Sequence, residues 1–284
     1  MANGSAECAS RRSPVARWRG RVFVATLLAV GVLLSGSRVA APASPVVSGA
    51  GPVVSSSSTQ VVVGIAEDWQ STSATLQSYE RVKGRWRSVG SRFTGRLGPN
   101  GLAWGRGLHP SSVTDAPGAV AKREGDKRSP AGVFTLPTAF GYDPAWATRT
   151  RLPYVTVGPR DLFGEDPSSP DYNTHVRLDH DPATDEERKQ QMYQTDPAHR
   201  LEVLVGHNVS PAPVPGAGSA IFIHSWRGQG ARTTTGCTAV SDAAIDGLVR
   251  WLDPAAHPLY VLLPRAEYEA RRHTWGLPDL ASAV

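Results

Sequence analysis

Short apolar runs separated by glycine, proline and polar residues fill the chain from residue 60 onward. Many alternate between two faces and are rich in Val, Ile, Phe and Tyr, which is typical of β-strands. Two of them, 74–82 and 84–98, are predicted to form a hairpin that turns at Lys83–Gly84. Further strands are predicted at 60–66, 132–136, 152–158, 200–208, 219–225 and 258–264. The 28 glycines and 23 prolines supply many turns, so the pattern favours a mainly β fold.

The segment 219–225, "SAIFIHS", is the strongest of these strand signals. Side chains alternate along a strand, so Ile221 and Ile223 should point to one face. Phe222 and His224 should then point to the other face. The strand therefore places a histidine at its end.

A helical pattern is clear in one segment, 241–254. Ser241 is a good N-cap, the apolar residues that follow have helical spacing, and Pro254 ends the run. A second, short helix is expected at the end of the polar and turn-rich stretch 164–190. The predicted fold class is therefore mainly β with one or two short helices.

The first 43 residues have the order of a secretory signal peptide. A basic segment, "RRSPVARWRGR", precedes an apolar run at 22–34, and small residues follow. The alternative is a membrane anchor, but this run is shorter than the roughly 20 residues that span a bilayer. We therefore expect export with cleavage near 41–44, and membrane contact only through this segment if it stays uncleaved. The Ser/Gly/Pro-rich residues 44–59 predict a flexible linker.

The rest of the chain is predicted to hold a β-rich segment at 60–98, a catalytic-type domain at 99–264 and a tail at 265–284. The β-rich segment should pack on the catalytic domain. The formal net charge of +5 comes from the N-terminal region, which holds six arginines and one acid. The remaining 24 basic and 24 acidic residues balance, so charge gives no reason to expect nucleic-acid binding.

Cysteine is almost absent from the chain. Cys8 lies in the predicted signal peptide, which leaves Cys237 without a partner for an internal disulfide. A lone cysteine is often an inert core residue. Its neighbours indicate chemistry instead, because the glycine-containing loop after His224 can bring a base to the thiol. Gly236 would let a substrate carbonyl approach the backbone, where the N–H of Cys237 could stabilise an oxyanion.

These residues resemble the signature of the YkuD-type L,D-transpeptidases. "GSAIFIHSW" followed by "TTTGC" is similar to that family's strand-end His and downstream Gly-Cys. "KREGDKRSPAGVF" at 122–134 and "SSPDYN" at 168–173 resemble two further family blocks, in the same order. The resemblance covers roughly 98–264. It implies a β-sandwich-like catalytic domain, with the cysteine on a sheet-edge segment and the peptide stems of peptidoglycan as substrate.

The resemblance also implies a role for each site residue. They are the nucleophile Cys237, the base and later acid His224, Ser225 with a main-chain carbonyl that orients the imidazole, and Gly236, which shapes the oxyanion hole. A thioester acyl-enzyme would form. Attack on it by an amine would make a crosslink, and attack by water would leave a trimmed stem. Thr235 and Ala239 depart from many members, which have a histidine and an Asn or Arg there.

Four further residues are candidates for substrate binding. Arg227 and Arg232 lie in the loop between base and nucleophile, where either could pair with a stem carboxylate, or be a solvated loop residue. Tyr172 and Asn173 belong to a matched family block, with a structural turn role as the alternative.

No metal or other cofactor is expected. The segment 175–181 contains two histidines and two aspartates, but their spacing fits no strong zinc motif. Three functions stay open for the cysteine site: L,D-transpeptidase, L,D-carboxypeptidase, and a catalytically inactive wall-binding module. A zinc peptidase that uses 175–181 is a weaker alternative.

Overall fold

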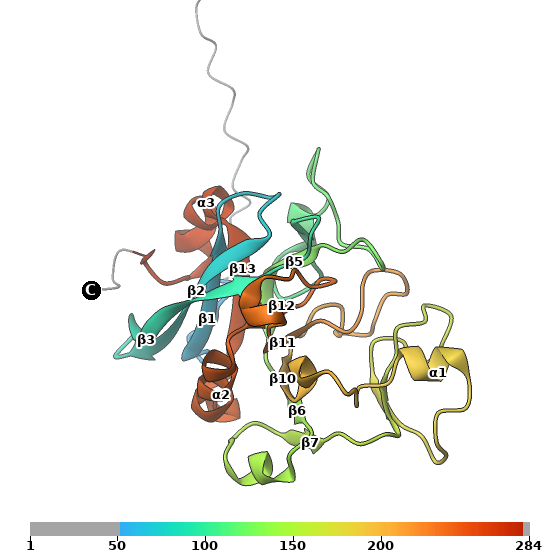
Figure 1. The fold of residues 1–284 in the computed structure, drawn as a ribbon. Coiled ribbons are helices and arrows are strands. Elements are labelled where there is room, and N and C mark those ends of the chain that lie inside the picture. Colours follow the sequence, from blue (N-terminus) through green and yellow to red (C-terminus); the bar gives the residue numbers. More distant parts are fainter. Residues whose placement is uncertain (1–51, 281–284) are drawn as a thin grey trace, which may run out of the picture. The chain divides into compact units, whose positions relative to one another are not determined.

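The computed structural model describes residues 52–280 (Figure 1). The predicted signal peptide at 1–43 and the first part of the predicted linker lie outside these residues. The second part, 52–59, is not a free linker. Val54 is buried, and its backbone N–H donates to the Trp275 carbonyl at 2.9 Å. The linker prediction is therefore wrong for residues 52–59.

The fold is built on a large mixed sheet, which confirms the mainly β prediction. Eleven strands follow one another in the sheet in the order β4-β5-β13-β1-β2-β3-β12-β11-β10-β6-β7. Their bounds are β1 (Gln60–Ala66), β2 (Ser73–Val82), β3 (Arg85–Arg96), β4 (Leu102–Trp104), β5 (Ser129–Thr135), β6 (Ala139–Gly141), β7 (Tyr154–Thr156), β10 (Leu201–Leu204), β11 (Phe222–Ser225), β12 (Thr238–Val240) and β13 (Leu259–Pro264). A second sheet pairs β8 (Asp161–Phe163) with β9 (His175–Arg177).

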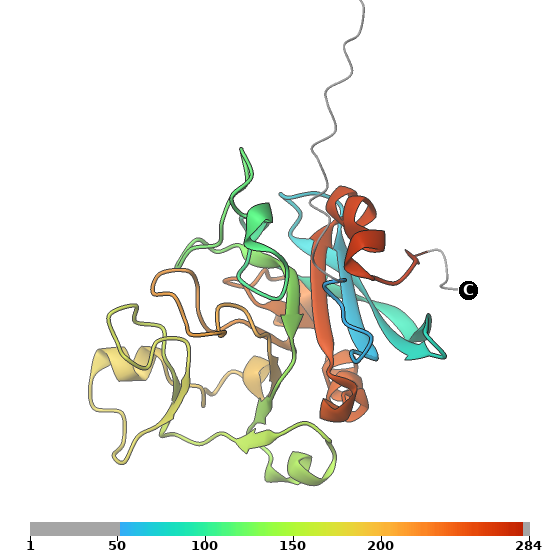
Figure 2. The same cartoon turned by 180° about the vertical axis from the view of Figure 1, so that it is seen from behind.

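The N-terminal strands stand inside the large sheet. β1 pairs in parallel with β13 and antiparallel with β2, and β3 pairs with β12. Figure 2 shows β13 (red) between β1 (blue) and β5 (green). Residues 60–98 are therefore part of the sheet that carries the site, and the expected boundary at 99 falls within one continuous structure.

The predicted hairpin turn is present between β2 and β3. Val82 faces Arg85 across the hairpin, and both turn residues have positive φ, 50° at Lys83 and 77° at Gly84. Positive φ at both central residues is the requirement of a tight type I′ turn, whose twist matches that of the strands. This turn holds the register that brings β3 beside β12.

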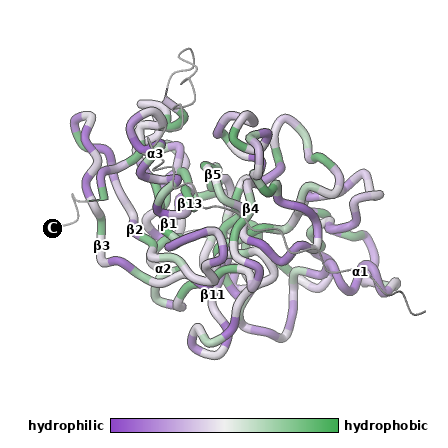
Figure 3. Tube along the Cα trace, turned by 90° about the horizontal axis from the view of Figure 1, so that it is seen from above, coloured by the Kyte–Doolittle hydropathy of each residue, from purple (hydrophilic) through white to green (hydrophobic). Residues whose placement is uncertain are grey.

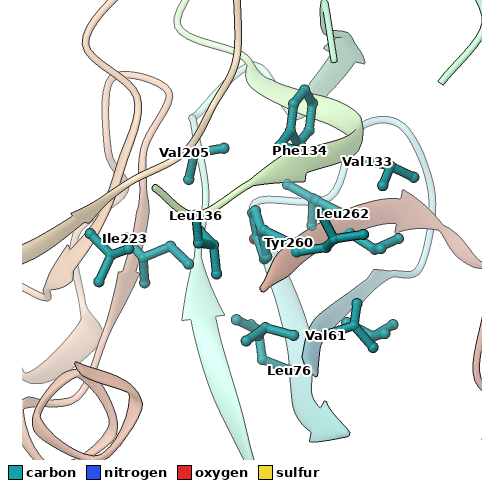
Figure 4. Close-up of a cluster of buried hydrophobic side chains, with 14 of the residues drawn as sticks. Val61, Leu76, Val133, Phe134, Leu136, Val205, Ile223, Tyr260 and Leu262 are labelled. Carbon is teal, nitrogen blue, oxygen red and sulfur yellow. The ribbon is translucent and has the colours of Figure 1, made fainter. Parts of the chain in front are cut away.

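The main core is a cluster of buried apolar side chains, many of them from the strands, and Figure 4 shows part of it. Ile223 of β11 belongs to this core, together with residues of β1, β5 and β13 such as Val61, Phe134 and Leu262. A second, smaller cluster contains Phe222 and Cys237. The predicted alternation along 219–225 is thus confirmed, since neighbouring residues of β11 enter different clusters.

Three helices flank the strands, one more than expected: α1 (Asp185–Lys189), α2 (Asp242–Trp251) and α3 (Arg265–Trp275). The α2 helix begins as predicted, because the Ser241 hydroxyl accepts the Ala244 N–H at 3.2 Å. The short α1 lies in the hydrophilic part of the chain (Figure 3), where a short helix was predicted.

The α3 helix occupies the segment predicted as a tail. Most of its residues are polar, which hides the helical period from a sequence reading. Two residues seven apart, Tyr268 and Trp275, are nevertheless buried on one face. Gly276 ends the helix with φ 70°, the left-handed conformation typical of a helix C-terminus.

Candidate active site

Cys237 directly precedes β12, in the interior of the large sheet. The strand β12 has β11 on one side and β3 on the other, so the expected sheet-edge position is wrong. In the parallel pair of β11 and β12, His224 is level with Ala239 and Ile223 with Thr238. Extending this register by one residue places Cys237 level with Phe222 and on the same face as His224. Strand spacing and rise then put the Cα atoms of Cys237 and His224 about 8 Å apart, within reach of their side chains.

The turn before the cysteine is fixed by one hydroxyl. Thr234 Oγ1 donates to the Cys237 carbonyl at 2.7 Å and accepts the Gly236 N–H at 3.1 Å. Ser129 Oγ, from β5, donates to the same carbonyl at 3.3 Å. Thr234 therefore has a structural role, which its position in the sequence alone did not indicate.

Gly236 is required by its conformation and by its surroundings. Its φ is +145°, which L side chains rarely adopt. A Cβ there would lie 3.0 Å from the Arg128 carbonyl oxygen and 3.2 Å from Ile221 Cδ1. Glycine therefore suits both the backbone conformation and the close approach of Arg128 and Ile221 immediately before Cys237.

The Cys237 thiol is buried and contacts backbone groups at the start of β11 and just before it. Its side chain belongs to a residue only 7% exposed, and Sγ lies 3.4 Å from both the Phe222 nitrogen, which donates to it, and the Ala220 carbonyl, to which it donates. Burial raises the pKa of Cys237 to about 12, because the charged thiolate loses its solvation. The resting side chain is therefore a protonated thiol.

His224 is held by its neighbour's backbone. Nδ1 lies 2.7 Å from the Ser225 carbonyl oxygen, which can only accept, so Nδ1 carries the ring proton and Nε2 is left as the basic nitrogen. This is the contact that the family resemblance implies for Ser225. Burial, followed by the neighbouring His199, lowers the pKa of His224 to about 3. The imidazole is therefore neutral beside a neutral thiol.

Two cavities meet at Cys237. The first, which we call the His224 cavity, has a volume of about 250 Å³ and is lined by His224, Phe222 and Arg227 among others. The second, the Lys122 cavity, has about 240 Å³ and is lined by Lys122, Lys127 and Ser219. Four residues line both: Glu165, Ala220, Thr235 and Cys237. The thiol thus lies where the two cavities meet, and together they form a groove with two arms.

The three sequence blocks converge on this site through buried polar contacts. Glu124 of the first block accepts the Tyr172 hydroxyl at 2.5 Å and the Ser219 hydroxyl at 2.8 Å. Lys122 Nζ pairs with Asp126 at 2.5 Å. These bonds join the segments 122–134, 168–173 and 219–225, which are far apart in the sequence.

Asn173 makes the second link between the blocks. Its side-chain nitrogen donates to the carbonyls of His207 and Asn208, at 3.0 and 2.9 Å, and its oxygen accepts the Ala220 N–H at 3.0 Å. Both Tyr172 and Asn173 are buried, and neither lines the two cavities. Their polar groups hold the start of β11, and substrate contact by these two residues stays a prediction.

The two candidate arginines have different positions. Arg227 lines the His224 cavity, where its guanidinium binds the Asp196 carboxylate and lies 3.2 Å from His199 Nε2. Arg232 is exposed in the loop and lines neither cavity. Of the two arginines, the structure therefore brings only Arg227 to the cavity that Cys237 and His224 line.

Sequence reasoning missed His199 and Glu202. Both line the His224 cavity, and they contact each other at 2.8 Å. The His199 ring stacks on the ring of His224 with centroids 4.6 Å apart. No sequence motif marks these residues, since Glu202 reaches the site through the pairing of β10 with β11 and His199 lies in the 3₁₀ helix that directly precedes β10.

The segment 175–181 has no metal-site geometry. His175 pairs with Asp161 at 2.8 Å, and His180 pairs with Asp179 and Glu187. Within residues 52–280, no group of three or more His, Cys, Asp or Glu residues is arranged to hold a metal ion. Over the same residues, none of the helices has the length and apolar character needed to cross a membrane.

The sequence and the fold were also compared with known proteins. Residues 79–261 match the family model of the L,D-transpeptidase catalytic domain, YkuD. A similar solved structure is that of the helical cell shape determining protein Pgp2 from Campylobacter jejuni, at 14% identity and a TM-score of 0.31. That alignment covers 72% of this chain and 48% of Pgp2, so the chain spans about half the length of Pgp2. No match was found among curated proteins. Because the family model covers more than half of the sequence, the chain belongs to the L,D-transpeptidase catalytic domain family.

Proposed function

We propose that the protein is a cysteine-dependent L,D-transpeptidase that acts on peptidoglycan stem peptides through a thioester acyl-enzyme. The observation that carries this proposal is the Cys237 thiol at the junction of two cavities, with the neutral base His224 in one of them. Family membership supports the substrate class. The N-terminal sequence order supports export, which would place the enzyme beside the cell wall.

The chemistry follows from the two neutral side chains. As Cys237 Sγ attacks the carbonyl carbon of the L-centre residue, its proton passes to His224 Nε2, because Nδ1 is engaged with Ser225. The carbonyl oxygen gains charge beside the Gly236–Cys237 backbone, where the missing Cβ leaves room for it. The terminal D-residue then leaves as an amine that takes the proton from His224.

The second arm of the groove favours transpeptidation over hydrolysis. A crosslinking enzyme must hold an acyl donor and an amine acceptor on the two sides of the thioester, whereas hydrolysis requires only water. The Lys122 cavity provides a second space next to Cys237. Glu165 lines both cavities, and burial raises its pKa to about 7, so it can accept a hydrogen bond or a proton from an incoming amine. The neutral acceptor amine attacks the thioester carbonyl carbon, the C–S bond breaks, and the amine proton passes through His224 Nε2 to the departing sulfur, which restores the Cys237 thiol and completes the crosslink.

Incubation with a tetrapeptide stem and mass analysis tests the proposal. We expect a crosslinked dimer and a thioester adduct on Cys237, both absent in Cys237→Ala and both retained in the matched loop control Thr233→Val. Activity should persist in a chelator. A trimmed tripeptide without dimer would support the carboxypeptidase alternative. No product from a protein whose thiol still alkylates would contradict an enzymatic role and support a wall-binding module.

A further inference from the structure

A second histidine lies against the catalytic one. His199 ends the short 3₁₀ helix Pro197–His199, directly before β10. Its ring stacks on the ring of His224, with centroids 4.6 Å apart and planes 28° from parallel. This stacked contact restricts the plane of the His224 imidazole.

The protonation of His199 follows from its two partners. Arg227 Nη2 lies 3.2 Å from His199 Nε2, and a guanidinium can only donate, so Nε2 is an acceptor. The ring proton must therefore be on Nδ1, which donates to Glu202 Oε2 at 2.8 Å. The His199 ring is thus held between a guanidinium and a carboxylate, with both nitrogens in use.

Glu202 is a buried acid that forms no ion pair with a lysine or arginine among residues 52–280. It is 3% exposed and stands directly opposite His224 in the antiparallel pair of β10 and β11. Its ion-pair-type contact is with His199. A buried charge without a counter-charge is costly, so its presence suggests a state in which a cation appears nearby.

We propose that Glu202 and His199 are positioning residues for His224. The Glu202 carboxylate stabilises the imidazolium that forms when His224 takes the thiol proton, and the His199 ring holds that imidazole and separates it from Arg227. The inference rests on the function proposed above.

The proton balance of this step is simple. The S–H bond of Cys237 breaks, the proton goes to His224 Nε2, and the sulfur electron pair forms the bond to the carbonyl carbon. Glu202 and His199 release no proton. The charged or titratable groups that line the cavity around this pair are Glu165, Lys189, His199, Glu202, Arg227 and Cys237. Of these, Glu202 is the acid that the strand register sets directly beside His224.

Two substitutions of Glu202 separate charge from shape. Glu202→Gln keeps the shape and an acceptor for His199 but removes the charge, whereas Glu202→Asp keeps the charge and shortens the reach. If the charge matters, kcat should fall about tenfold in the Gln variant, the change that corresponds to one pKa unit, with KM within about twofold. The Asp variant should be closer to wild type. A structural role predicts the reverse order, with the Asp variant more impaired.

A second readout needs no peptidoglycan. In a Cys8→Ser protein, Cys237 is the single thiol, and its alkylation by iodoacetamide at pH 7.5 depends on proton transfer to His224. We expect slower alkylation in Glu202→Gln and in His199→Phe, which keeps a stacked ring but breaks both bonds. The exposed carboxylate Glu67 provides the control Glu67→Gln, which should react at the wild-type rate.

The two readouts distinguish the possible failures. If Glu202→Gln and His199→Phe alkylate more slowly but neither the wild type nor any variant turns over the stem peptide, the result would support this inference and contradict the proposed transpeptidase function. Wild-type turnover with an unchanged kcat and an unchanged alkylation rate in Glu202→Gln would overturn the inference alone. A Gln variant that is faster than the Asp variant in both assays would also overturn it.

Discussion

Thr234 is predicted to control both the stability and the reactivity of the nucleophile turn. Thr234→Val removes the bond to the Cys237 carbonyl and leaves the buried Gly236 N–H without its acceptor. Each lost bond costs about 1 kcal/mol net, and an unpaired buried donor costs about 1–3 kcal/mol. The added methyl recovers about 0.8 kcal/mol by burial. The expected loss is about 2 kcal/mol, since Ser129 still donates to the carbonyl.

Thermal unfolding and turnover measure this prediction. A loss of about 2 kcal/mol lowers Tm by about 4–8 °C in a domain of this size. Turnover should fall by more than tenfold, because a shift of about 1 Å at a reacting atom can cost about a hundredfold. Two neighbours serve as controls: Thr234→Ser retains the hydroxyl, and Thr233→Val makes the same change at an exposed position. If Thr234→Val unfolds within 1 °C of Thr233→Val, the argument from these two hydrogen bonds is wrong.

Three further predictions follow from the same geometry. Asn173→Ala should lower the urea midpoint, with a loss of about 3 kcal/mol, because three buried hydrogen bonds disappear at a residue with φ 57°; an unchanged midpoint would contradict the linking role. Gly236→Ala should abolish turnover and cost about 1–3 kcal/mol from backbone strain, and an active variant would refute the need for glycine. Because the pKa of Cys237 is raised, its iodoacetamide alkylation rate should climb steadily from pH 7 to pH 10, and a rate already maximal at pH 7 would rule out a protonated resting thiol.

Local signals in the sequence were enough to predict most of the strands and the start of α2. The hairpin turn at Lys83–Gly84 and the Ser241 cap depend on neighbouring residues only, so they could be read directly. The α3 helix could not, because its buried face contains few apolar residues among many charges. The place of residues 60–98 inside the large sheet could not be read for another reason: strand pairing between residues as distant as Val61 and Leu259 has no local signal.

The residues of the site divide in the same way, into those with a local sequence signal and those that only the strand pairing places. Cys237, His224 and Gly236 lie within one segment and could be predicted, and the Ser225 carbonyl contact followed from the family resemblance. His199 and Glu202 could not be found, because the register of β10 against β11 brings them to the cavity.

The sequence blocks themselves have a physical explanation in the structure. Their polar residues are mostly bonded to one another, as in the contacts of Glu124 with Tyr172 and Ser219. These bonds hold the segment before β11, which provides the Ala220 carbonyl, and β11 itself provides the Phe222 N–H, so that both groups contact the thiol. A motif that was selected as a candidate for substrate contact thus also builds the frame of the nucleophile.

Burial of Cys237 and His224 also explains how an exported protein could keep a lone cysteine without its oxidation or mispairing. The thiolate is the form that oxidants and disulfides attack, so a thiol held protonated is protected. The raised pKa of Cys237 and the lowered pKa of His224 have the same cause, which is loss of solvation for the charged forms. The pair therefore becomes reactive when an acyl donor binds. Its carbonyl carbon then accepts the electron pair of the sulfur while the thiol proton moves to His224. In the exported setting that we propose, this lets a single thiol persist without a disulfide partner and still act as a nucleophile.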